Sequence, residues 1–163
     1  MIGIIYGSNL GNTEDVANKI ANKLGLDHKV LNISKVKPSD INSFDKLIIG
    51  TSTWNDGELQ DDWADFNFDE LDVNGKTIAL FGTGDGQSYG DTFCNAMGEL
   101  YKIFNAKGAN IVGAVSADGY SFDESTAIIN DKFVGLPIDI DNESDKTDDR
   151  VTNWIKLIKP NFE

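Results

Sequence analysis

Residues 6–15 read Y-G-S-N-L-G-N-T-E-D and are rich in glycine, hydroxyl and amide side chains. It follows the apolar run Ile2-Gly3-Ile4-Ile5, a pattern typical of a short strand that is buried on both faces. Beyond it, apolar residues recur at helical spacing up to a stop at Gly25, namely Val16, Ala17, Ile20, Ala21 and Leu24. The sequence therefore predicts a strand, a tight polar turn and a helix, which together open an α/β fold.

The same alternation continues along the chain. Further strands are predicted at 29–33, 46–51, 77–83 and 109–115. Further helices are predicted around 59–66, over 91–108 with Asp91 as the cap, and from Thr147 to Lys159-Pro160. Strands that alternate with helices imply a parallel sheet with right-handed crossovers and with helices covering both faces.

Size and composition fit one globular domain over residues 1–163, since 40% of the residues are hydrophobic and 25% are charged. The sequence shows neither a basic start followed by an apolar segment nor a long apolar run, so we expect a soluble protein of the cytoplasm. The lone cysteine, Cys94, excludes an internal disulfide and suits a reducing compartment. With one His and one Cys, we expect no metal held by nitrogen or sulfur.

The formal net charge of −13 comes from 27 acidic and 14 basic residues. Such a surface repels nucleic acid and anionic membranes and attracts basic proteins, although acidity also serves solubility alone. Between Lys46 and Lys76 there is no basic residue, and the acids in this interval are Asp56, Glu58, Asp61, Asp62, Asp65, Asp69, Glu70 and Asp72. This one-signed stretch favours docking of a basic partner, with Asp61, Asp62 and Asp65 as candidate contacts.

Ligands of parallel α/β sheets bind beyond the carboxyl ends of the strands, which directs attention to the loops 7–13, 51–58 and 83–91. The first loop, Ser8-Asn9-Leu10-Gly11-Asn12-Thr13, offers glycine, hydroxyls and a helix N-terminus, which together suit an anion such as phosphate. It is not a nucleoside-triphosphate loop, because Asn12 stands where that motif has Lys. The alternative is a simple helix cap after a tight turn.

The other two loops each carry an aromatic residue among polar turn residues. Trp54 lies in Thr51-Ser52-Thr53-Trp54-Asn55-Asp56-Gly57, and Tyr89 lies in the glycine-rich segment from Thr83-Gly84-Asp85 to Asp91. Either ring could stack on a planar ligand. The alternative for the second loop is that Trp54 folds back over the edge of the sheet, and the alternative for the third loop is a flexible turn. Because all three loops converge on one crevice, their conjunction favours a planar ligand that carries a phosphate.

A segment over residues 116–143 is too long for a simple connection between a strand and a helix. We expect an insertion at about 116–138, near the last strand, after which K-F-V-G-L-P-I-D-I returns to the sheet. Within it, Tyr120 and Phe122 either contact a partner or anchor their own loop.

These motifs resemble the flavodoxin family nearly from end to end. The stretches that carry the resemblance are G-S-N-L-G-N-T-E, T-S-T-W-N-D-G-E-L-Q-D-D-W and F-G-T-G-D-G-Q-S-Y-G-D-T-F-C-N-A. The inserted segment and the closing K-F-V-G-L-P-I-D-I-D-N-E-S-D resemble the long-chain subgroup of that family. The resemblance implies a flavodoxin-like, doubly wound, five-stranded parallel sheet of order 2-1-3-4-5 in three α/β/α layers, with flavin mononucleotide (FMN) as the cofactor.

The resemblance also implies a role for each loop. Residues Ser8 to Thr13 would hold the phosphate, Trp54 and Tyr89 would cover the two faces of the flavin ring, and Thr83-Gly84-Asp85 would meet its polar edge. A peptide at Asn55-Asp56 or Asp56-Gly57 would turn its carbonyl toward flavin N5 upon one-electron reduction. The implied cofactor-binding set is Ser8, Asn9, Leu10, Gly11, Asn12, Thr13, Thr51, Ser52, Thr53, Trp54, Asn55, Asp56, Gly57, Thr83, Gly84, Asp85, Tyr89 and Asp91.

Three positions depart from the family pattern. Leu10 stands where Ser or Thr is common, so that one phosphate donor is missing. Asp56 and Gln87 stand where apolar residues often flank the flavin.

The implied function is that of a monomeric, low-potential, one-electron carrier rather than an enzyme. Carboxylates around the ring oppose its reduction, by about 1.7 kcal/mol for one charge at ~10 Å, or ~70 mV for one electron. We therefore expect a low-potential second reduction and a stabilised neutral semiquinone. The implied partners are ferredoxin–NADP reductase, photosystem I or other basic redox proteins. An FMN-dependent quinone reductase of the same fold is the alternative, while a receiver domain is disfavoured because Ser8-Asn9-Leu10 replaces its acidic cluster.

Overall fold

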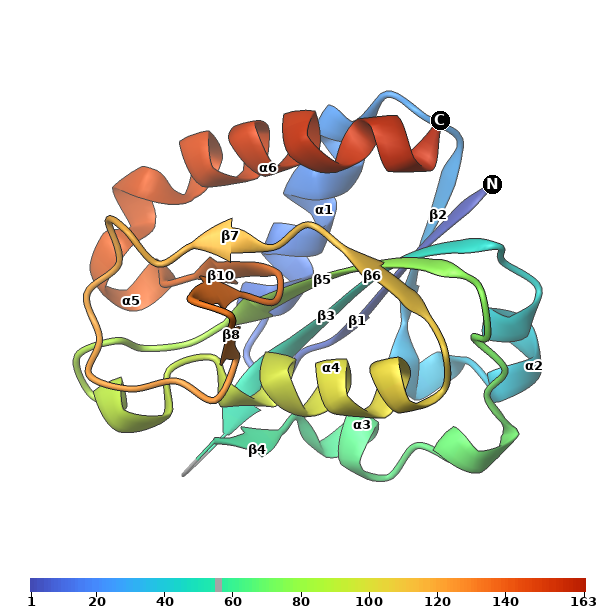
Figure 1. Ribbon diagram of the computed structural model, residues 1–163, viewed down its shortest axis with the longest axis horizontal. Coiled ribbons are helices and arrows are strands. Elements are labelled where there is room, and N and C mark those ends of the chain that lie inside the picture. Colours follow the sequence, from blue (N-terminus) through green and yellow to red (C-terminus); the bar gives the residue numbers. More distant parts are fainter. Residues whose placement is uncertain (55–56) are drawn as a thin grey trace.

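The computed structural model describes residues 1–54 and 57–163 and is built around a parallel sheet. Its central strands run in the order β2, β1, β3, β5 and then the last strand, as Figure 1 shows. Their bounds are β1 (Ile2–Gly7), β2 (His28–Asn32), β3 (Lys46–Trp54) and β5 (Thr77–Thr83). The predicted order 2-1-3-4-5 is therefore confirmed.

The last strand of the sheet is made of two separate pieces. β6 (Asn110–Val112) pairs with the first half of β5, and β10 (Leu136–Ile138) pairs with its second half. The predicted strand 109–115 is therefore too long at its end, because the insertion leaves the sheet after Val112 and β10 completes the edge. Within the insertion, the short strands β7 (Val115–Ser116), β9 (Lys132–Phe133) and β8 (Ile128–Ile129) form a separate antiparallel sheet.

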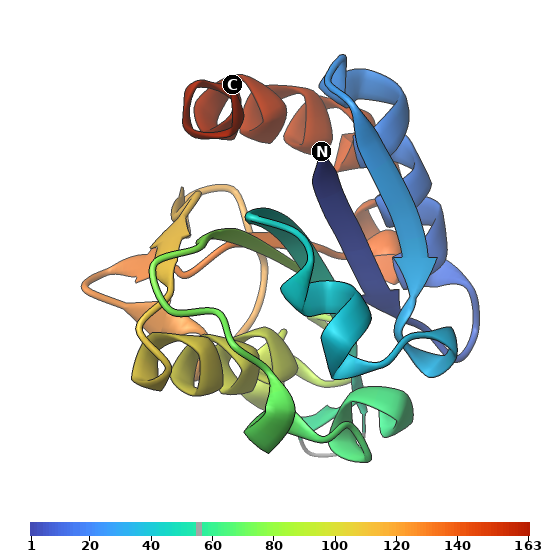
Figure 2. The ribbon, with the colours of Figure 1, turned by 90° about the vertical axis from the view of Figure 1, so that its right-hand side faces the viewer.

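Helices cover both faces of the sheet in three layers (Figures 1 and 2). One face carries α1 (Asn12–Leu24) and α6 (Thr147–Phe162), and the other carries α2 (Pro38–Asn42), α3 (Asp61–Ala64) and α4 (Asn95–Ala106). The short helices are α5 (Ile140–Glu143) and the 3-10 turns η1 (Ile33–Lys35), η2 (Phe68–Glu70), η3 (Gly90–Thr92) and η4 (Ser144–Lys146). Within residues 1–54 and 57–163, no helix has the length and apolar character needed to cross a membrane.

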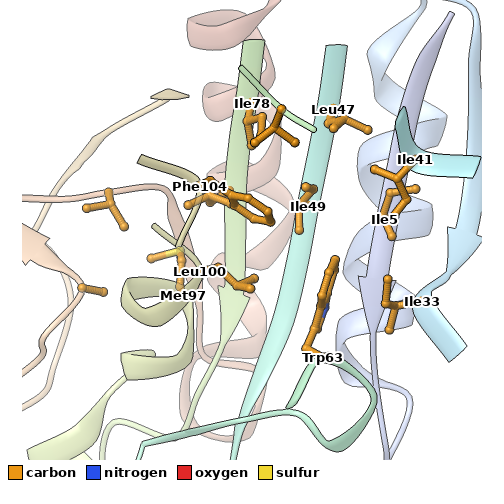
Figure 3. Packing of buried hydrophobic residues seen from close by; sticks show 14 of the residues in the cluster. Ile5, Ile33, Ile41, Leu47, Ile49, Trp63, Ile78, Met97, Leu100 and Phe104 are labelled. Carbon is orange, nitrogen blue, oxygen red and sulfur yellow. The ribbon is translucent and has the colours of Figure 1, made fainter. Parts of the chain in front are cut away.

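Neighbouring residues of each central strand enter different cores. Ile4 and Ile48 pack against α1 and α6, whereas Ile5 and Ile49 pack against the layer of α3 and α4. Figure 3 shows the second core, in which Trp63 lies beside Ile5 and Ile49. Since side chains alternate across a strand, a strand covered on both faces must be apolar at consecutive positions.

The helix predicted from Asp91 begins four residues later than expected. α4 starts at Asn95, after Cys94 in the left-handed region with φ of 53°. The backbone before α4 is hydrogen-bonded to the insertion, because the amides of Asp123 and Glu124 donate to the carbonyl of Gly90 at 3.0 and 2.9 Å. The prediction that Asp91 caps this helix is therefore wrong, and no side chain caps α4.

Two further boundaries differ from the sequence prediction. Leu59 lies in β4 (Glu58–Leu59), which pairs antiparallel with β3, so the helix predicted around 59–66 shortens to α3. At the other end, α6 continues through Pro160 to Phe162, whose side chain is buried in the core beside α1. Burial of Phe162 explains why Pro160 does not end the helix as predicted.

The insertion is anchored to the rest of the fold by Tyr120 and Arg150. The Tyr120 hydroxyl donates to the carbonyl of Pro137 at 2.8 Å, and the Arg150 guanidinium lies 3.9 Å from the centre of the Tyr120 ring. Arg150 also donates to the carbonyl of Gly119 at 2.9 Å and to Glu143 at 3.1 Å. Phe122 stacks on the buried Phe93, so Tyr120 and Phe122 both anchor their own loop.

The Glu143 ion pair makes stability depend on pH. Burial raises the pKa of Glu143, but hydrogen bonds and charge from Lys146 and Arg150 outweigh that effect and hold the pKa below its ordinary value of 4.5. A group with a lowered pKa in the folded state stabilises the protein above the unfolded pKa, and this stability is lost as the pH falls through the folded value. We predict that Glu143→Gln lowers the free energy of unfolding by about 2 kcal/mol at pH 7 and by less at lower pH.

Urea unfolding at several pH values measures this difference. Glu99→Gln is the matched control, because Glu99 forms an exposed ion pair with Lys102 and its loss should cost no more than about 0.5 kcal/mol. A difference between wild type and Glu143→Gln that stays constant from pH 7 into the acid range would contradict the prediction.

Candidate functional site

A cavity of about 200 Å³ lies at the carboxyl ends of β1, β3 and β5. The three loops singled out in the sequence converge on it, together with the start of α5. The lining residues are Ser8, Asn9, Leu10, Asn12, Thr13, Ser52, Thr53, Trp54, Thr83, Gly84, Asp85, Tyr89, Thr92, Ile140 and Asp141. No Lys or Arg is among them, so the described wall of the cavity carries acidic but no basic side chains.

The first loop presents an uncapped helix N-terminus to the cavity. Gly11 precedes α1 with φ of 94°, a left-handed conformation that glycine adopts without strain, and no side chain caps the helix. The Ser8 hydroxyl instead accepts a hydrogen bond from the Gly11 amide at 3.0 Å, which closes the turn. The alternative of a capped helix is thereby wrong, and the N–H groups of the first turn are available to an anion.

The first and third loops are joined by a hydrogen bond between two hydroxyls. Thr13 is fully buried, and its Oγ1 lies 2.9 Å from Oγ1 of Thr83. This bond connects the start of α1 to the end of β5 across β3. The Thr13 side chain therefore fixes the geometry of the loops, while its backbone amide belongs to the uncapped first turn.

The second loop carries buried polar atoms that lack hydrogen-bond partners. Among the described residues, Ser52 Oγ, Thr53 Oγ1 and Trp54 Nε1 are buried in this way, and all three residues line the cavity. A buried polar group without a partner costs free energy, so such groups in one place point to a missing polar ligand. They come from consecutive residues at the end of β3, which is where the sequence predicted ligand contacts.

The third loop is fixed by the carboxylates of Asp85 and Asp139. Asp85 accepts from the amides of Gln87 and Ser88 at 3.1 and 2.9 Å and from the side chain of Asn142 at 2.8 Å. Asp139 is buried and accepts from the Gly86 amide at 3.0 Å, while it also caps α5. Both carboxylates thus hold the loop in place beside the cavity.

Acidic groups give this end of the site a negative potential. Burial raises the pKa of Asp85, but hydrogen bonds from Ser88, Asn142 and Gln87 outweigh it, so that the net shift is downward. Burial also raises the pKa of Asp141, and the charges of Asp85 and Asp139 raise it further. The repulsion among these three groups disfavours additional negative charge in the cavity.

Comparison with known proteins agrees with this geometry. The profile of the family described as Flavodoxin matches residues 4–154. The chain belongs to the flavodoxin family. It is 45% identical to a flavodoxin of Nostoc sp. over 99% of this chain and 96% of the relative, and 45% identical to flavodoxin 1 of Azotobacter vinelandii over 99% and 97%.

Solved structures give the same result. A flavodoxin of Fusobacterium nucleatum bound to flavin mononucleotide has a TM-score of 0.92 and 35% identity, covering 99% of this chain and 98% of that one. A point mutant of that flavodoxin, also bound to flavin mononucleotide, has a TM-score of 0.92 and 36% identity, with coverage of 99% and 96%. Flavodoxins are electron-transfer proteins rather than enzymes, which sets the quinone reductase alternative aside for this family member.

The cavity contains most, but not all, of the residues expected from the flavodoxin resemblance. Those that line it are Ser8, Asn9, Leu10, Asn12, Thr13, Ser52, Thr53, Trp54, Thr83, Gly84, Asp85 and Tyr89. Four expected residues are not among the lining, namely Gly11, Thr51, Gly57 and Asp91. Asn55 and Asp56, with the peptide expected to turn toward the flavin, lie outside the described residues.

Gly11 and Thr51 support the lining residues instead of joining them. Gly11 forms the turn before α1, and the buried Thr51 hydroxyl donates to the carbonyl of Ser52 at 2.8 Å. Asp91 is exposed, since the helix it was expected to cap begins later.

Sequence reasoning missed Thr92, Ile140 and Asp141, which line the cavity from η3 and α5. The available signal was the segment D-I-D-N-E-S-D, which begins at the end of the stretch predicted to return to the sheet. Asp139 is the cap of α5, and the residues directly after it reach the cavity because β10 ends beside β5. Recognising this required the register of β10, which the sequence does not reveal.

The single cysteine and the single histidine do not line the cavity. Cys94 is fully buried, and burial together with the charge of Asp139 raises the pKa of its thiol, so it is an unreactive core residue. His28 accepts or donates a hydrogen bond with the carbonyl of Leu26 at 2.8 Å, at the opposite end of the sheet. Across the residues described, no cluster of three or more His, Cys, Asp or Glu side chains is arranged to hold a metal ion.

We predict that Asp139→Ala destabilises the chain and loosens the third loop. The substitution leaves the amides of Gly86 and Asn142 without their acceptor, at a cost of about 2–3 kcal/mol of unfolding free energy. Hydrogen exchange should accelerate at the Gly86 amide, which NMR resolves residue by residue. Asp145→Ala, at an exposed acid of η4, is the control. Unchanged protection of Gly86 in Asp139→Ala would contradict the role of Asp139.

Proposed function

We propose that this chain holds FMN non-covalently in the cavity and acts as a low-potential one-electron carrier between redox proteins. The observation that carries the proposal is the set of partnerless buried polar atoms at the end of β3, beside the uncapped N-terminus of α1. A flavin offers polar edge atoms to the first group, and its phosphate suits the second. Family membership and FMN-bound flavodoxin structures of Fusobacterium nucleatum support the same reading.

Residues Ser8 to Thr13 hold the phosphate without a cation. A helix N-terminus carries a partial positive charge, and the backbone N–H groups of its first turn point toward an anion. Asn9 and Asn12 line the same part of the cavity and add side-chain N–H donors. Leu10 contributes no donor and has 84% of its surface exposed, so its side chain is not needed for packing the loop.

Trp54 and Tyr89 cover the faces of the ring, while Thr83, Gly84 and Asp85 meet its polar edge. Tyr89 is 55% exposed, which is unusual for a large aromatic residue and leaves its ring surface available for stacking. When bound, FMN supplies the one-electron chemistry. The chain orients the ring, excludes water from its faces and surrounds it with negative charge from Asp85 and Asp141, which lowers the potential of reduction.

Three finer assignments belong to this proposal. The split last strand and the insertion between β6 and β10 support the long-chain subgroup. The shared cores on both faces of one sheet support a single domain over residues 1–163 that works as a monomer. The buried, unpaired Cys94 supports a cytoplasmic location.

We predict that the full chain binds FMN and that Tyr89→Ala weakens this binding about tenfold through loss of ring stacking. Titration of FMN into the chain, followed by flavin fluorescence, measures both affinities. Leu157→Ala is the control, because Leu157 is an exposed apolar residue of α6 that does not line the cavity. The proposed function fails if the wild-type chain leaves FMN fluorescence and absorbance unchanged.

Electrostatic docking of basic partners is the second part of the proposal. Candidate partners are ferredoxin–NADP reductase, photosystem I and other basic redox proteins, attracted by a net charge of −13. Asp61 and Asp65 are exposed on α3 and at its end, whereas the carboxylate of Asp62 accepts a hydrogen bond from Gln60 at 2.8 Å. Asp61 and Asp65 are therefore better docking contacts than Asp62.

We predict that the rate of electron exchange with ferredoxin–NADP reductase falls as ionic strength rises, because salt screens exposed charges. In the double variant Asp61→Asn/Asp65→Asn, this rate should drop several-fold at low salt and approach the wild-type rate at high salt. Stopped-flow measurement across a salt series tests both statements, with Asp118→Asn/Asp145→Asn, which also removes two exposed carboxylates, as the charge-matched control. A rate of electron exchange that does not change with ionic strength would contradict electrostatic docking.

A further inference from the structure

Gln60 is a fully buried side chain whose carboxamide uses all of its hydrogen-bonding capacity. Its Oε1 accepts from the amides of Asp62 and Trp63 at 3.1 and 3.3 Å, which caps α3. Its Nε2 donates to the Asp62 carboxylate at 2.8 Å and to Oδ1 of Asn9 at 2.7 Å. One side chain at the start of α3 thus holds the first loop, across 51 positions of sequence.

Chemistry fixes the orientation of both amides in this arrangement. Backbone N–H groups only donate and a carboxylate only accepts, so Gln60 must direct its oxygen at α3 and its nitrogen at Asp62. The atom of Asn9 that faces the same nitrogen must then be an acceptor, which is its Oδ1. The Nδ2 group of Asn9 is left pointing away from Gln60, and Asn9 itself is exposed.

Asn9 lines the cavity in the loop that lacks a cation. Whether its amide offers donors or an oxygen to a phosphate therefore decides whether it attracts or repels that group. We infer that Gln60 is a positioning residue for phosphate binding, because it holds the Asn9 carboxamide with its N–H donors turned toward the anion. This inference rests on the proposed binding of FMN.

A direct test substitution is Gln60→Glu, which keeps an oxygen acceptor for the cap of α3 but replaces the donor that faces both Asn9 and the Asp62 carboxylate. The new carboxylate oxygen would favour rotation of the Asn9 amide, which would present its oxygen to the phosphate. We expect FMN affinity to fall by about tenfold or more, whereas affinity for riboflavin, which lacks the phosphate, changes by less than about twofold. Asn67→Asp is the matched control, an amide-to-carboxylate change at an exposed residue outside the cavity.

A double-mutant cycle with Asn9→Ala separates positioning from general damage. If Gln60 acts through Asn9, adding Gln60→Glu to Asn9→Ala should change FMN affinity by less than about twofold. Urea unfolding of each variant checks that the chain is folded at the temperature of the titration.

The outcomes are distinguishable. If the wild-type chain does not bind FMN, the proposed function is wrong, irrespective of the results with the variants. If the wild-type chain binds FMN, three results would overturn the positioning role alone. Gln60→Glu could lower the affinities for FMN and riboflavin equally, or it could leave FMN affinity unchanged. The third result is that Gln60→Glu lowers FMN affinity as strongly in the Asn9→Ala background as in the wild type.

Discussion

Burial of both faces of β1, β3 and β5 is the constraint on which the rest of the structure depends. Ile4 and Ile5, like Ile48 and Ile49, are fully buried although they point to opposite sides of the sheet. A shift of register by one residue would exchange the two cores completely, so the strands are locked against one another. The carboxyl ends of these strands therefore meet at one edge of the sheet, and the loops that follow them lie together at that edge.

The strands bring the loops to the same edge of the sheet, and hydrogen bonds between neighbouring segments then fix the positions of the loops. The Thr13–Thr83 bond joins the first loop to the third, the Gln60–Asn9 bond joins the start of α3 to the first loop, and the Asp139–Gly86 bond joins the third loop to α5. Each contains at least one buried side chain, for which the loss of a partner is expensive. The cavity is thus surrounded by mutual restraints before any ligand arrives, which lowers the ordering cost of binding.

The absence of Lys and Arg from the described lining follows from the same arrangement. A cation in the first loop would strengthen phosphate binding, but it would also offset the negative potential that Asp85 and Asp141 maintain. Neutral donors separate these two requirements, because N–H groups act on the phosphate at contact distance while carrying no net charge to the ring. In the proposed complex with FMN, local donors would hold the phosphate, and carboxylates at the other end of the cavity would set the potential.

Much of this could be predicted from the sequence because its signals are local. Apolar strands, the helical stripe of α1 and the three polar loops follow from patterns within about ten residues, and these patterns predicted the α/β class and the three loops that line the cavity. The order of the strands came from the resemblance to flavodoxins. The roles of Gln60 and Asp139 could not be predicted, because each acts on a backbone or side chain more than fifty positions away in sequence. Similarly, Asp91 has the residue type preferred for a helix cap, but long-range hydrogen bonds from the insertion hold the neighbouring backbone in another conformation.

Those bonds give the insertion a structural part in the site. Its residues 123 and 124 hold the carbonyl of Gly90, its Ser125 hydroxyl donates to the carbonyl of Phe93, and Phe122 stacks on the Phe93 ring. The third loop is therefore held between the insertion on one side and Asp139 on the other, with Tyr89 exposed between them. An insertion that splits the last strand costs ladder hydrogen bonds at the edge of the sheet, yet it also supplies the backbone partners that keep the third loop in position beside the cavity. Because Arg150 binds both Tyr120 of the insertion and Glu143 of α5, these two supports are themselves connected, and the third loop rests on one continuous frame.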